Sequence, residues 1–379
     1  MGNRKRIGIV YSFNESWLGG VYYILNLIKS LSMMEDALIP IIDLYCCDET
    51  TFKRVLDETK YPYLNYHSYK ESQYKRYIWL FLKKINHRLA HRYYPSRFDS
   101  RDALVYPYYL GANVKSVSWC PDFQEKYMPE CFSESDIKSR SNMMKYVGDN
   151  QVPIVFSSET CLNDFKRFYP QFSNTTFVLK FAVIHPRYDD LEPKSLLEKH
   201  HIPQRYFLCS NQFWKHKNHL FLFRSFRKAI DSGLDAYLIC TGNMSDYRNP
   251  DYIHEIEQFL SVHNQDNRIR LLGMIDRKEQ LCLMKHAYSV IQPSLFEGWN
   301  TTVEDCKAMN QHVFLSDIPV HREQMNRNVC FFNPHNESDL VEKLLTVKPT
   351  FDDYDYQKDI LRFGRGFVDL IHQLGGIVS

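Results

Sequence analysis

The side chains best suited to chemistry lie in the stretch YSVIQPSLFEGWNTTVEDCKAMNQHVFLSDIPVHRE, residues 288–323. Its β-branched and aromatic start, closed by Pro293, predicts a buried strand that ends in a turn. A loop with Glu297 follows, and a helix is predicted from about Thr301. Such a strand-to-helix loop faces the ligand crevice of an open α/β sheet, where free amides favour phosphate. A carboxylate accepts hydrogen bonds from hydroxyls, so Glu297 is expected to hold a sugar.

This stretch resembles the signature of family 4 retaining glycosyltransferases, the glycogen-synthase-like group with the GT-B fold. The matching residues are Glu297, Gly298, Trp299, Asp305 eight positions after Glu297, and the turn Ser316–Pro319. The second acid of the family is usually Glu, whereas this chain has Asp305 with Glu304 beside it. The resemblance implies an α/β chain of two Rossmann-like domains facing across a cleft. It also implies a nucleotide-sugar donor, retention of anomeric configuration and no metal cofactor.

The helix that begins near Thr301 has two possible caps, Asn300 and Thr301. Thr301 with Glu304 three positions later fits a capping box, in which two side chains satisfy the first free amides. On that prediction Glu304 is occupied at the cap. Asp305 lies one turn after Thr301 on the same face, so it is the acid expected to contact the nucleotide ribose.

A second strand-to-helix loop spans residues 211–218, after a strand at Tyr206–Ser210. The resemblance implies an Arg and a Lys here, both directed at the donor diphosphate. Lys217 matches the Lys, Asn211 or Gln212 stands at the Arg position, and Lys215 can supply the missing cation. The alternative for the two lysines is ordinary surface charge, which a loop opposite a second phosphate-facing loop disfavours.

Glycines complete the predicted donor site. Gly19 and Gly20 follow a first strand and either let amides approach an anion or form a tight turn, and the resemblance favours the anion. Gly242 and Gly273 end two later strands and can present backbone groups to a base. The candidate donor-binding residues are Gly19, Gly20, Asn211, Lys215, Lys217, Gly242, Gly273, Glu297, Asn300, Thr301, Thr302 and Asp305.

The acceptor side is predicted around Asp122. The run Trp119–Gln124 resembles the Trp-x-Pro-Asp-Phe-Gln loop of a bacterial subset of the family. Asp122 is the candidate for binding an acceptor hydroxyl, and the alternative is that it caps a turn after Pro121. The acid/base group stays open, since the histidine that many members carry here is absent between residues 92 and 184. The catalytic candidates are Glu297, Lys217 and Asp122.

The chain of 379 residues is long enough for two domains. Strand and helix patterns alternate, which is typical of βαβ units. Residues 1–190 are predicted to form the acceptor-side domain, with a terminal helix in 351–379 packing back on it. Residues 203–350 are predicted to bind the nucleotide sugar. The charged, poorly periodic stretch 186–203 predicts a linker between them.

Composition excludes several classes of function. A net charge of +2 argues against nucleic-acid binding through bulk electrostatics. The 10 cysteines lack paired CxxC spacing, so neither a zinc site nor a secreted disulfide framework is expected. The chain starts in a strand without a long apolar signal, and no run could span a bilayer. A cytoplasmic protein is expected.

One segment is strongly basic, in contrast to the nearly balanced charge of the whole chain. Residues 74–92 predict an amphipathic helix whose apolar residues Ile78, Leu82, Ile85 and Leu89 recur at helical spacing. The flanking charges are Lys75, Arg76, Lys83, Lys84, Arg88 and Arg92, with no acid among them. Such a helix either packs against its own domain, which is the commoner case, or contacts the inner face of a membrane peripherally.

These patterns predict a retaining hexosyltransferase that needs no metal and moves a sugar from a UDP- or GDP-sugar to a hydroxyl. The acceptor is a glycan or a lipid-linked intermediate of cell-surface polysaccharide or lipopolysaccharide synthesis. Two alternatives remain open because the family's Arg and histidine are missing: a GT-B nucleotide-sugar epimerase, and a donor-binding module without activity.

Overall fold

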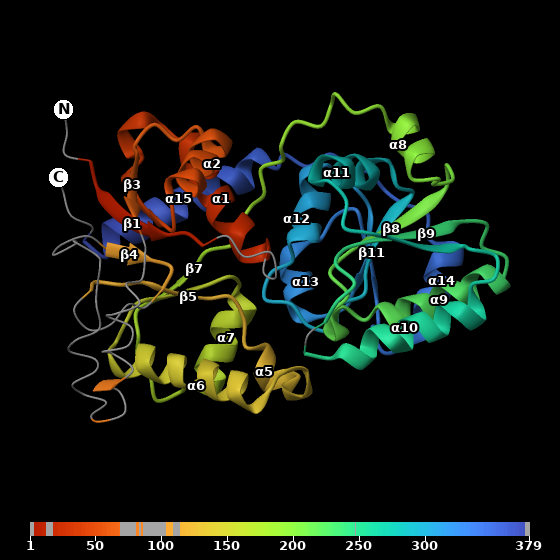
Figure 1. Cartoon of the computed structure of the whole chain (residues 1–379), viewed down its shortest axis with the longest axis horizontal. Helices are drawn as coiled ribbons and strands as arrows, with labels where there is room; N and C mark the ends of the chain where they lie inside the picture. The colour runs from red at the N-terminus through yellow and green to blue at the C-terminus, as the bar shows by residue number, and fades with distance from the viewer. Residues whose placement is uncertain are drawn as a thin grey trace. The chain divides into compact units, whose positions relative to one another are not determined.

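The computed structural model describes residues 4–12, 18–68, 81–82, 85, 104–108, 114–246 and 248–375 (Figure 1). The chain divides into two compact units. Unit 1 contains Met1–Pro121, Ser139–Ile184 and Gln357–Ser379, and unit 2 contains Asp122–Lys138 and His185–Tyr356. The predicted basic helix lies outside the described residues except at positions 81, 82 and 85, which are helical.

Unit 1 is built on two parallel sheets. The four-stranded sheet has the order β3-β2-β1-β4, and the three-stranded sheet has the order β5-β6-β7. Their bounds are β1 Arg6–Val10, β2 Ile41–Cys46, β3 Leu64–Ser68, β4 Leu104–Tyr106, β5 Ser118–Cys120, β6 Ile154–Phe156 and β7 Thr176–Val178. β1 and β6 are apolar almost throughout and buried, as parallel strands covered on both faces must be.

The longer helices of unit 1 are α1 Leu18–Ser32, α2 Glu49–Thr59, α7 Glu159–Phe168 and α15 Gln357–Gln373. The C-terminal helix α15 packs closely on α1. A Cβ at Gly364 would lie 3.0 Å from the carbonyl oxygen of Ser30, so glycine permits this approach. Phe363 of α15 lies beside Tyr23 of α1, with ring centroids 5.7 Å apart.

Unit 2 contains one six-stranded parallel sheet of order β10-β9-β8-β11-β12-β13. The strands are β8 Tyr206–Ser210, β9 Tyr237–Thr241, β10 Ile269–Gly273, β11 Ser289–Gln292, β12 Val313–Ser316 and β13 Val329–Phe332. After β8 the chain builds outward to β10, then returns to place β11 on the other side of β8. This reversal is a topological switch point, and α/β sheets bind ligands at the carboxyl ends of strands there.

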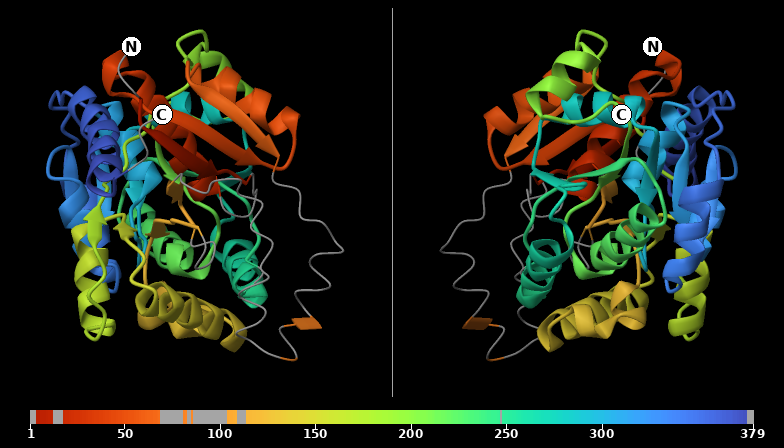
Figure 2. Two further views of the ribbon diagram at one scale, coloured as in Figure 1. Left: turned by 90° about the vertical axis from the view of Figure 1, so that its left-hand side faces the viewer. Right: turned by 90° about the vertical axis from the view of Figure 1, so that its right-hand side faces the viewer.

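Helices cover both faces of the six-stranded sheet (Figures 1 and 2). One face packs against α9 His219–Asp231, α10 Pro250–His263 and α14 Glu337–Thr346. The other packs against α8 Pro193–Lys199, α11 Arg277–His286 and α12 Thr301–Ala308. Shorter helices are α5 Gln124–Tyr127, α13 Pro319–Gln324, η2 Asp36–Leu38, η3 Pro129–Cys131 and η4 Lys215–Lys217. Helix α6 Glu134–Asp149 belongs to unit 2 up to Lys138 and to unit 1 from Ser139.

The linker prediction for 186–203 is wrong over Pro193–Lys199, which forms α8. The helix is short, and its single buried side chain, Leu196, packs with Leu281 in the core of unit 2. One apolar contact in a charged helix leaves too weak a periodic pattern to recognise in the sequence. Among the described residues, no helix is both long enough and apolar enough to cross a bilayer.

Candidate active site

Glu297 lies in the loop between β11 and α12, at the switch point of the six-stranded sheet. Its Oε1 accepts a hydrogen bond from Lys217 Nζ at 2.5 Å and another from Asn300 Nδ2 at 2.9 Å. The Lys217 and Glu297 side chains are only 15% and 9% exposed, so water screens their attraction weakly. The structure therefore joins the predicted lysine and carboxylate in one ion pair, although 80 positions separate them.

Asn300 caps the helix that follows. Its Oδ1 accepts a hydrogen bond from the backbone N–H of Val303 at 3.1 Å, while its Nδ2 donates to Glu297. Thr301 is the first helical residue, so the predicted capping box of Thr301 and Glu304 is wrong. A capping box needs its acid three positions after the cap, and with Asn300 as the cap that position is the apolar Val303.

Glu304 is instead a buried member of a polar network. Its Oε2 accepts from the Tyr356 hydroxyl at 2.5 Å, and its Oε1 accepts from Gln324 Nε2 at 2.9 Å and Lys307 Nζ at 3.2 Å. The residue is 1% exposed. Gln324 also bonds both backbone polar groups of Asn300, so this network supports the cap that holds Glu297.

Asp305 points to different partners from its neighbour. Its Oδ1 accepts hydrogen bonds from Arg277 Nη2 at 2.6 Å and His185 Nε2 at 3.0 Å. Burial alone would raise the pKa of Asp305, but the charge of Arg277 and the hydrogen bond from His185 outweigh it and lower the pKa. The other oxygen, Oδ2, is buried and has no hydrogen-bond partner among the described residues.

The loop between β8 and α9 is tied to the same sheet edge. Asn211 Nδ2 donates to Gln292 Oε1 at the end of β11, at 2.5 Å. Thr302 Oγ1 donates to the carbonyl oxygen of Ser210 at 2.9 Å. A Cβ on Gly242 would lie 1.9 Å from the carbonyl oxygen of Asn211, so only glycine allows the two strand ends to meet.

The remaining predicted residues occupy more varied positions. Lys215 is exposed, and its backbone N–H donates to Asp246 Oδ2 at 3.0 Å. Gly273 has φ +68°, a left-handed conformation that favours glycine. Gly19 and Gly20 lie in unit 1 within the first turn of α1, which begins at Leu18 rather than after them.

Asp122 belongs to unit 2 through the segment Asp122–Lys138. Its Oδ1 accepts from the backbone N–H of Gln124 at 3.1 Å, so it stabilises the turn that opens α5. Later in the segment, Tyr127 packs on Phe296, with ring centroids 5.4 Å apart. Phe296 immediately precedes Glu297, so the segment that carries Asp122 contacts the Glu297 loop.

Sequence reasoning did not identify Arg277 and His185. Arg277 is the first residue of α11, just beyond the β10 strand end at Gly273. Its place after a third strand of the same sheet is a signal that could have marked it as a cation of the site. His185 is 120 positions from Asp305, and nothing in its local sequence indicates the pairing.

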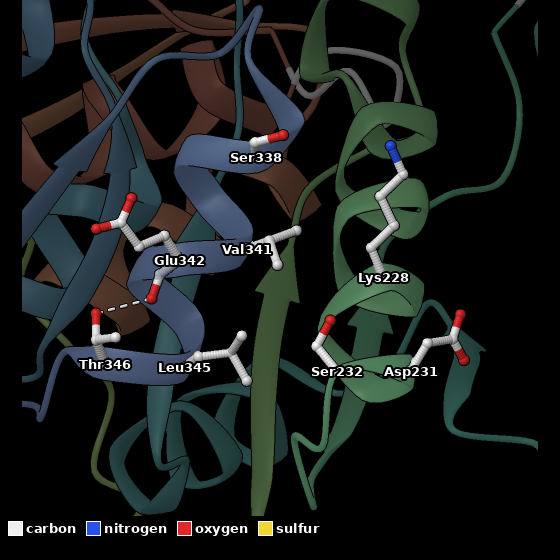
Figure 3. Close-up of a pocket in the computed structure, with 8 residues that line it drawn as sticks. All are labelled: Lys228, Asp231, Ser232, Ser338, Val341, Glu342, Leu345 and Thr346. Atoms are coloured by element: carbon white, nitrogen blue, oxygen red, sulfur yellow. Dashed lines mark hydrogen bonds between the residues drawn. The ribbon is translucent and has the colours of Figure 1, made fainter.

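A search for metal-binding groups and for cavities adds two observations. Among the described residues, no group of three or more His, Cys, Asp and Glu side chains is arranged to hold a metal. A groove of about 560 Å³ lies between α9 and α14, with Val341 and Leu345 of α14 directed toward α9 (Figure 3). None of the predicted site residues lines it; the lining residues are Lys228, Asp231, Ser232, Ser338, Val341, Glu342, Leu345 and Thr346.

Solved structures resemble this arrangement over nearly its full length. A glycosyltransferase from Rickettsia africae matches with a TM-score of 0.61 at 17% identity, covering 97% of this chain and 94% of that chain. Anabaena HepE in complex with UDP and glucose matches with a TM-score of 0.61 at 13% identity, covering 98% and 97%. This chain has the GT-B fold. WaaG, a glycosyltransferase involved in lipopolysaccharide biosynthesis, matches with a TM-score of 0.57 at 12% identity, covering 98% and 97%.

The α/β fold and its GT-B class are thus confirmed. In sequence the chain is similar to the O-antigen chain mannosyltransferase RfbU of Salmonella typhimurium, with 25% identity over 158 residues. That match covers 42% of this chain and 41% of RfbU, so the similarity spans about two-fifths of the relative. No protein-family model matches the chain.

Proposed function

We propose that this chain is a retaining glycosyltransferase that moves a hexose from a UDP- or GDP-sugar to a hydroxyl group without a metal ion. The ion pair of Lys217 and Glu297 at the switch point of the GT-B sheet carries this proposal. It places a cation and a carboxylate side by side, as a donor with an anionic diphosphate and a hydroxyl-rich sugar requires. Anabaena HepE, a fold relative, binds UDP and glucose.

The two charges have separate tasks in the proposed reaction. The bond between the anomeric carbon and the diphosphate oxygen breaks, the acceptor oxygen bonds to that carbon from the same face, and the hydroxyl proton passes to the departing diphosphate oxygen. Lys217 and the free amides at the start of α12 stabilise the negative charge of the departing diphosphate. Glu297 accepts from the sugar hydroxyls and favours the positive charge that develops at the anomeric carbon.

Asn300 fixes the position of Glu297 relative to the start of α12. It caps α12 through Oδ1 and holds Glu297 through Nδ2, so the helix amides and the carboxylate are fixed by one side chain. Such preorganisation matters because the donors must already point at the developing charge when the bond breaks. On the acceptor side, Asp122 is proposed to bind the attacking hydroxyl through its carboxylate.

The acceptor is proposed to be a glycan or a lipid-linked intermediate of cell-surface polysaccharide or lipopolysaccharide synthesis. RfbU is a mannosyltransferase of the O-antigen chain and WaaG acts in lipopolysaccharide biosynthesis, and these relatives support that class of acceptor. The test is a panel of UDP- and GDP-sugars, scored for thermal stabilisation of the protein and for release of nucleoside diphosphate. One base and sugar should do both, and failure of every nucleotide sugar would contradict the proposal.

The same panel separates the two alternatives. An epimerase would return the nucleotide sugar with an inverted carbon and would release no diphosphate in proportion to turnover. A donor-binding module would be stabilised by the nucleotide sugar yet release nothing, even with a glycan acceptor present. Transfer of the sugar to an added acceptor excludes both.

A peripheral contact with the inner face of a membrane is proposed for the basic segment 74–92. Its residues Phe81 and Ile85 are 63% and 64% exposed. Such exposure is expected of an apolar helix face that binds a membrane. Each basic residue near an anionic leaflet contributes about 1 kcal/mol. Binding to anionic vesicles should weaken with salt and with charge reversal at Lys83, Lys84 and Arg88. Equal and negligible binding to anionic and neutral vesicles would contradict this contact.

A further inference from the structure

Asp305 accepts hydrogen bonds from two side chains, not from one ion-pair partner alone. Arg277 and His185, which are far apart in the unit 2 sequence, both donate to the same oxygen, Oδ1. Because an ionised carboxylate can only accept, His185 Nε2 must carry the proton that it donates. Two donors on one oxygen fix the plane of the carboxylate and leave Oδ2 as the oxygen with accepting capacity.

The second carboxylate oxygen, Oδ2, is buried without a hydrogen-bond donor among the described residues. Asp305 is 1% exposed. A buried acceptor without a partner is costly, and natural structures retain one where a ligand or another function uses it. Two contacts place Asp305 of α12 near the ends of β8 and β10. Thr302 of the same helix donates to Ser210 at the end of β8, and Asp305 itself accepts from Arg277, which follows β10.

The guanidinium of Arg277 is held in turn by a second residue. Its Nη1 donates to Gln280 Oε1 at 2.7 Å, and Gln280 Nε2 donates to Ser210 Oγ at the end of β8. Arg277 therefore bridges Gln280 and Asp305 with two different nitrogens, which fixes the planar group in one orientation. Lysine has no such planar fork, so it would hold the two partners in a less defined orientation.

We propose that Arg277 and His185 are positioning residues, which clamp Asp305 so that its Oδ2 accepts a hydrogen bond from the ribose hydroxyls of the nucleotide. This inference rests on the proposed function, since it needs a nucleotide at this sheet edge. It also accounts for the shorter acid at this position. Aspartate has one methylene fewer than glutamate, so its carboxylate reaches less far and must be aimed by its neighbours.

The clamp and a purely structural ion pair predict different binding behaviour. If Arg277 acts through Asp305 on the ribose, its loss weakens nucleotides that have the ribose hydroxyls and spares those that lack them. If Arg277 only stabilises the fold, or contacts phosphate or base, its loss weakens both kinds of nucleotide by the same factor. The ratio of the two affinities therefore isolates the proposed role.

The experiment measures binding of UDP, GDP and their 2′- and 3′-deoxy analogues to the full chain by calorimetry. The unaltered protein should prefer the ribose form by about 10-fold or more, the effect of one hydrogen bond to a charged group. That preference should fall towards one in Arg277→Met and part-way in His185→Ala. Arg277→Lys and His185→Gln, which keep a donor, should restore part of it. With the donor sugar, KM should rise while kcat is retained.

Arg270→Met is the matched control, since Arg270 lies in β10 and donates to the carbonyl oxygens of His201 and Asn267. It should leave the ribose preference unchanged. If Arg277→Met fails to fold, His185→Ala and the deoxy analogues still decide, because Arg277 continues to compensate Asp305 in that variant. Equal losses for ribose and deoxy nucleotides would overturn the clamp. No nucleotide binding at all would instead contradict the proposed function, and the clamp with it.

Discussion

The β1–α1 region of unit 1 and the β8–β11 region of unit 2 are both strand ends followed by helices, yet they are built from different contacts. In unit 1, Tyr23 of α1 stacks on Trp119 with ring centroids 4.0 Å apart and hydrogen-bonds Tyr106 through its hydroxyl. In unit 2, Lys217 and Glu297 form a shielded ion pair. One region is an aromatic core, and the other is a set of buried charges and amides.

This contrast indicates which unit holds side chains arranged for a ligand. Aromatic packing is satisfied within the fold, whereas buried charges are costly unless they are paired, and they are retained where a function uses them. In unit 2 the members of each pair come from distant parts of the sequence, as Asn211 with Gln292 and Arg277 with Asp305 show. We infer that unit 2 is preorganised for the donor.

The largest expected effect comes from Glu297→Gln. The change keeps the size of the side chain and removes the charge that favours the transition state, so turnover should fall about 10²- to 10³-fold while folding is retained. Glu342→Gln, on the exposed side of α14, is the control and should leave turnover unchanged. Normal turnover in Glu297→Gln would remove this residue from the mechanism.

The neighbouring acids of α12 should separate binding from stability. Asp305→Asn should weaken nucleotide binding by about 10- to 100-fold, because a hydrogen bond to a charged group is lost. Glu304→Gln should instead lower the free energy of unfolding by about 1 to 3 kcal/mol, because Lys307, Tyr356 and Gln324 lose their charged partner. Calorimetry and urea unfolding of both variants measure this, and the reverse pattern would exchange the two roles.

The close approach of Gly242 to the Asn211 loop can be tested against an open glycine. Gly242→Ala combines strain at φ +142° with a clash, and we expect a loss of about 1 to 3 kcal/mol from each. Gly233 has φ +104° and nothing within 4 Å of a Cβ, so Gly233→Ala should lose only the strain. Nucleotide affinity should drop in Gly242→Ala alone. Equal effects in both variants would show that the contact does not support the site.

A further expected effect is a dependence of stability on pH. Burial lowers the pKa of His312 and of His321, each to about 4, and both belong to unit 2. The unfolded chain protonates these histidines near pH 6.5, whereas the folded chain keeps them neutral. Stability is therefore full above about pH 6.5 and is lost as the pH falls towards about 4, by up to about 1.4 kcal/mol per pH unit for each histidine.

His312→Gln tests this prediction in urea unfolding series between neutral and acid pH. The variant should lose stability less steeply than the unaltered protein, by the share of one histidine. Parallel curves would show that protonation of His312 is not coupled to unfolding.

The sequence predicts the elements of unit 2 closely because each has a strong local pattern. The strand at Tyr206–Ser210 and the helix start at Thr301 appear where the pattern places them. The details that depend on distant partners are different. The cap at Asn300 is held by Gln324, and the orientation of Asp305 depends on His185, neither of which a local window contains. Local periodicity thus predicts the scaffold, and the side-chain pairs across strand ends require the fold.

The decisive test of the proposed donor site is a crystal structure of the protein with the nucleoside diphosphate that binds best. We expect the diphosphate at Lys217 and the first amides of α12, and the ribose hydroxyls within hydrogen-bond distance of Asp305 Oδ2. We also expect the ion pair of Lys217 and Glu297 to open or shift when the ligand binds. A nucleotide bound elsewhere, such as in the groove between α9 and α14, with the Lys217 and Glu297 pair undisturbed, would contradict the proposed site.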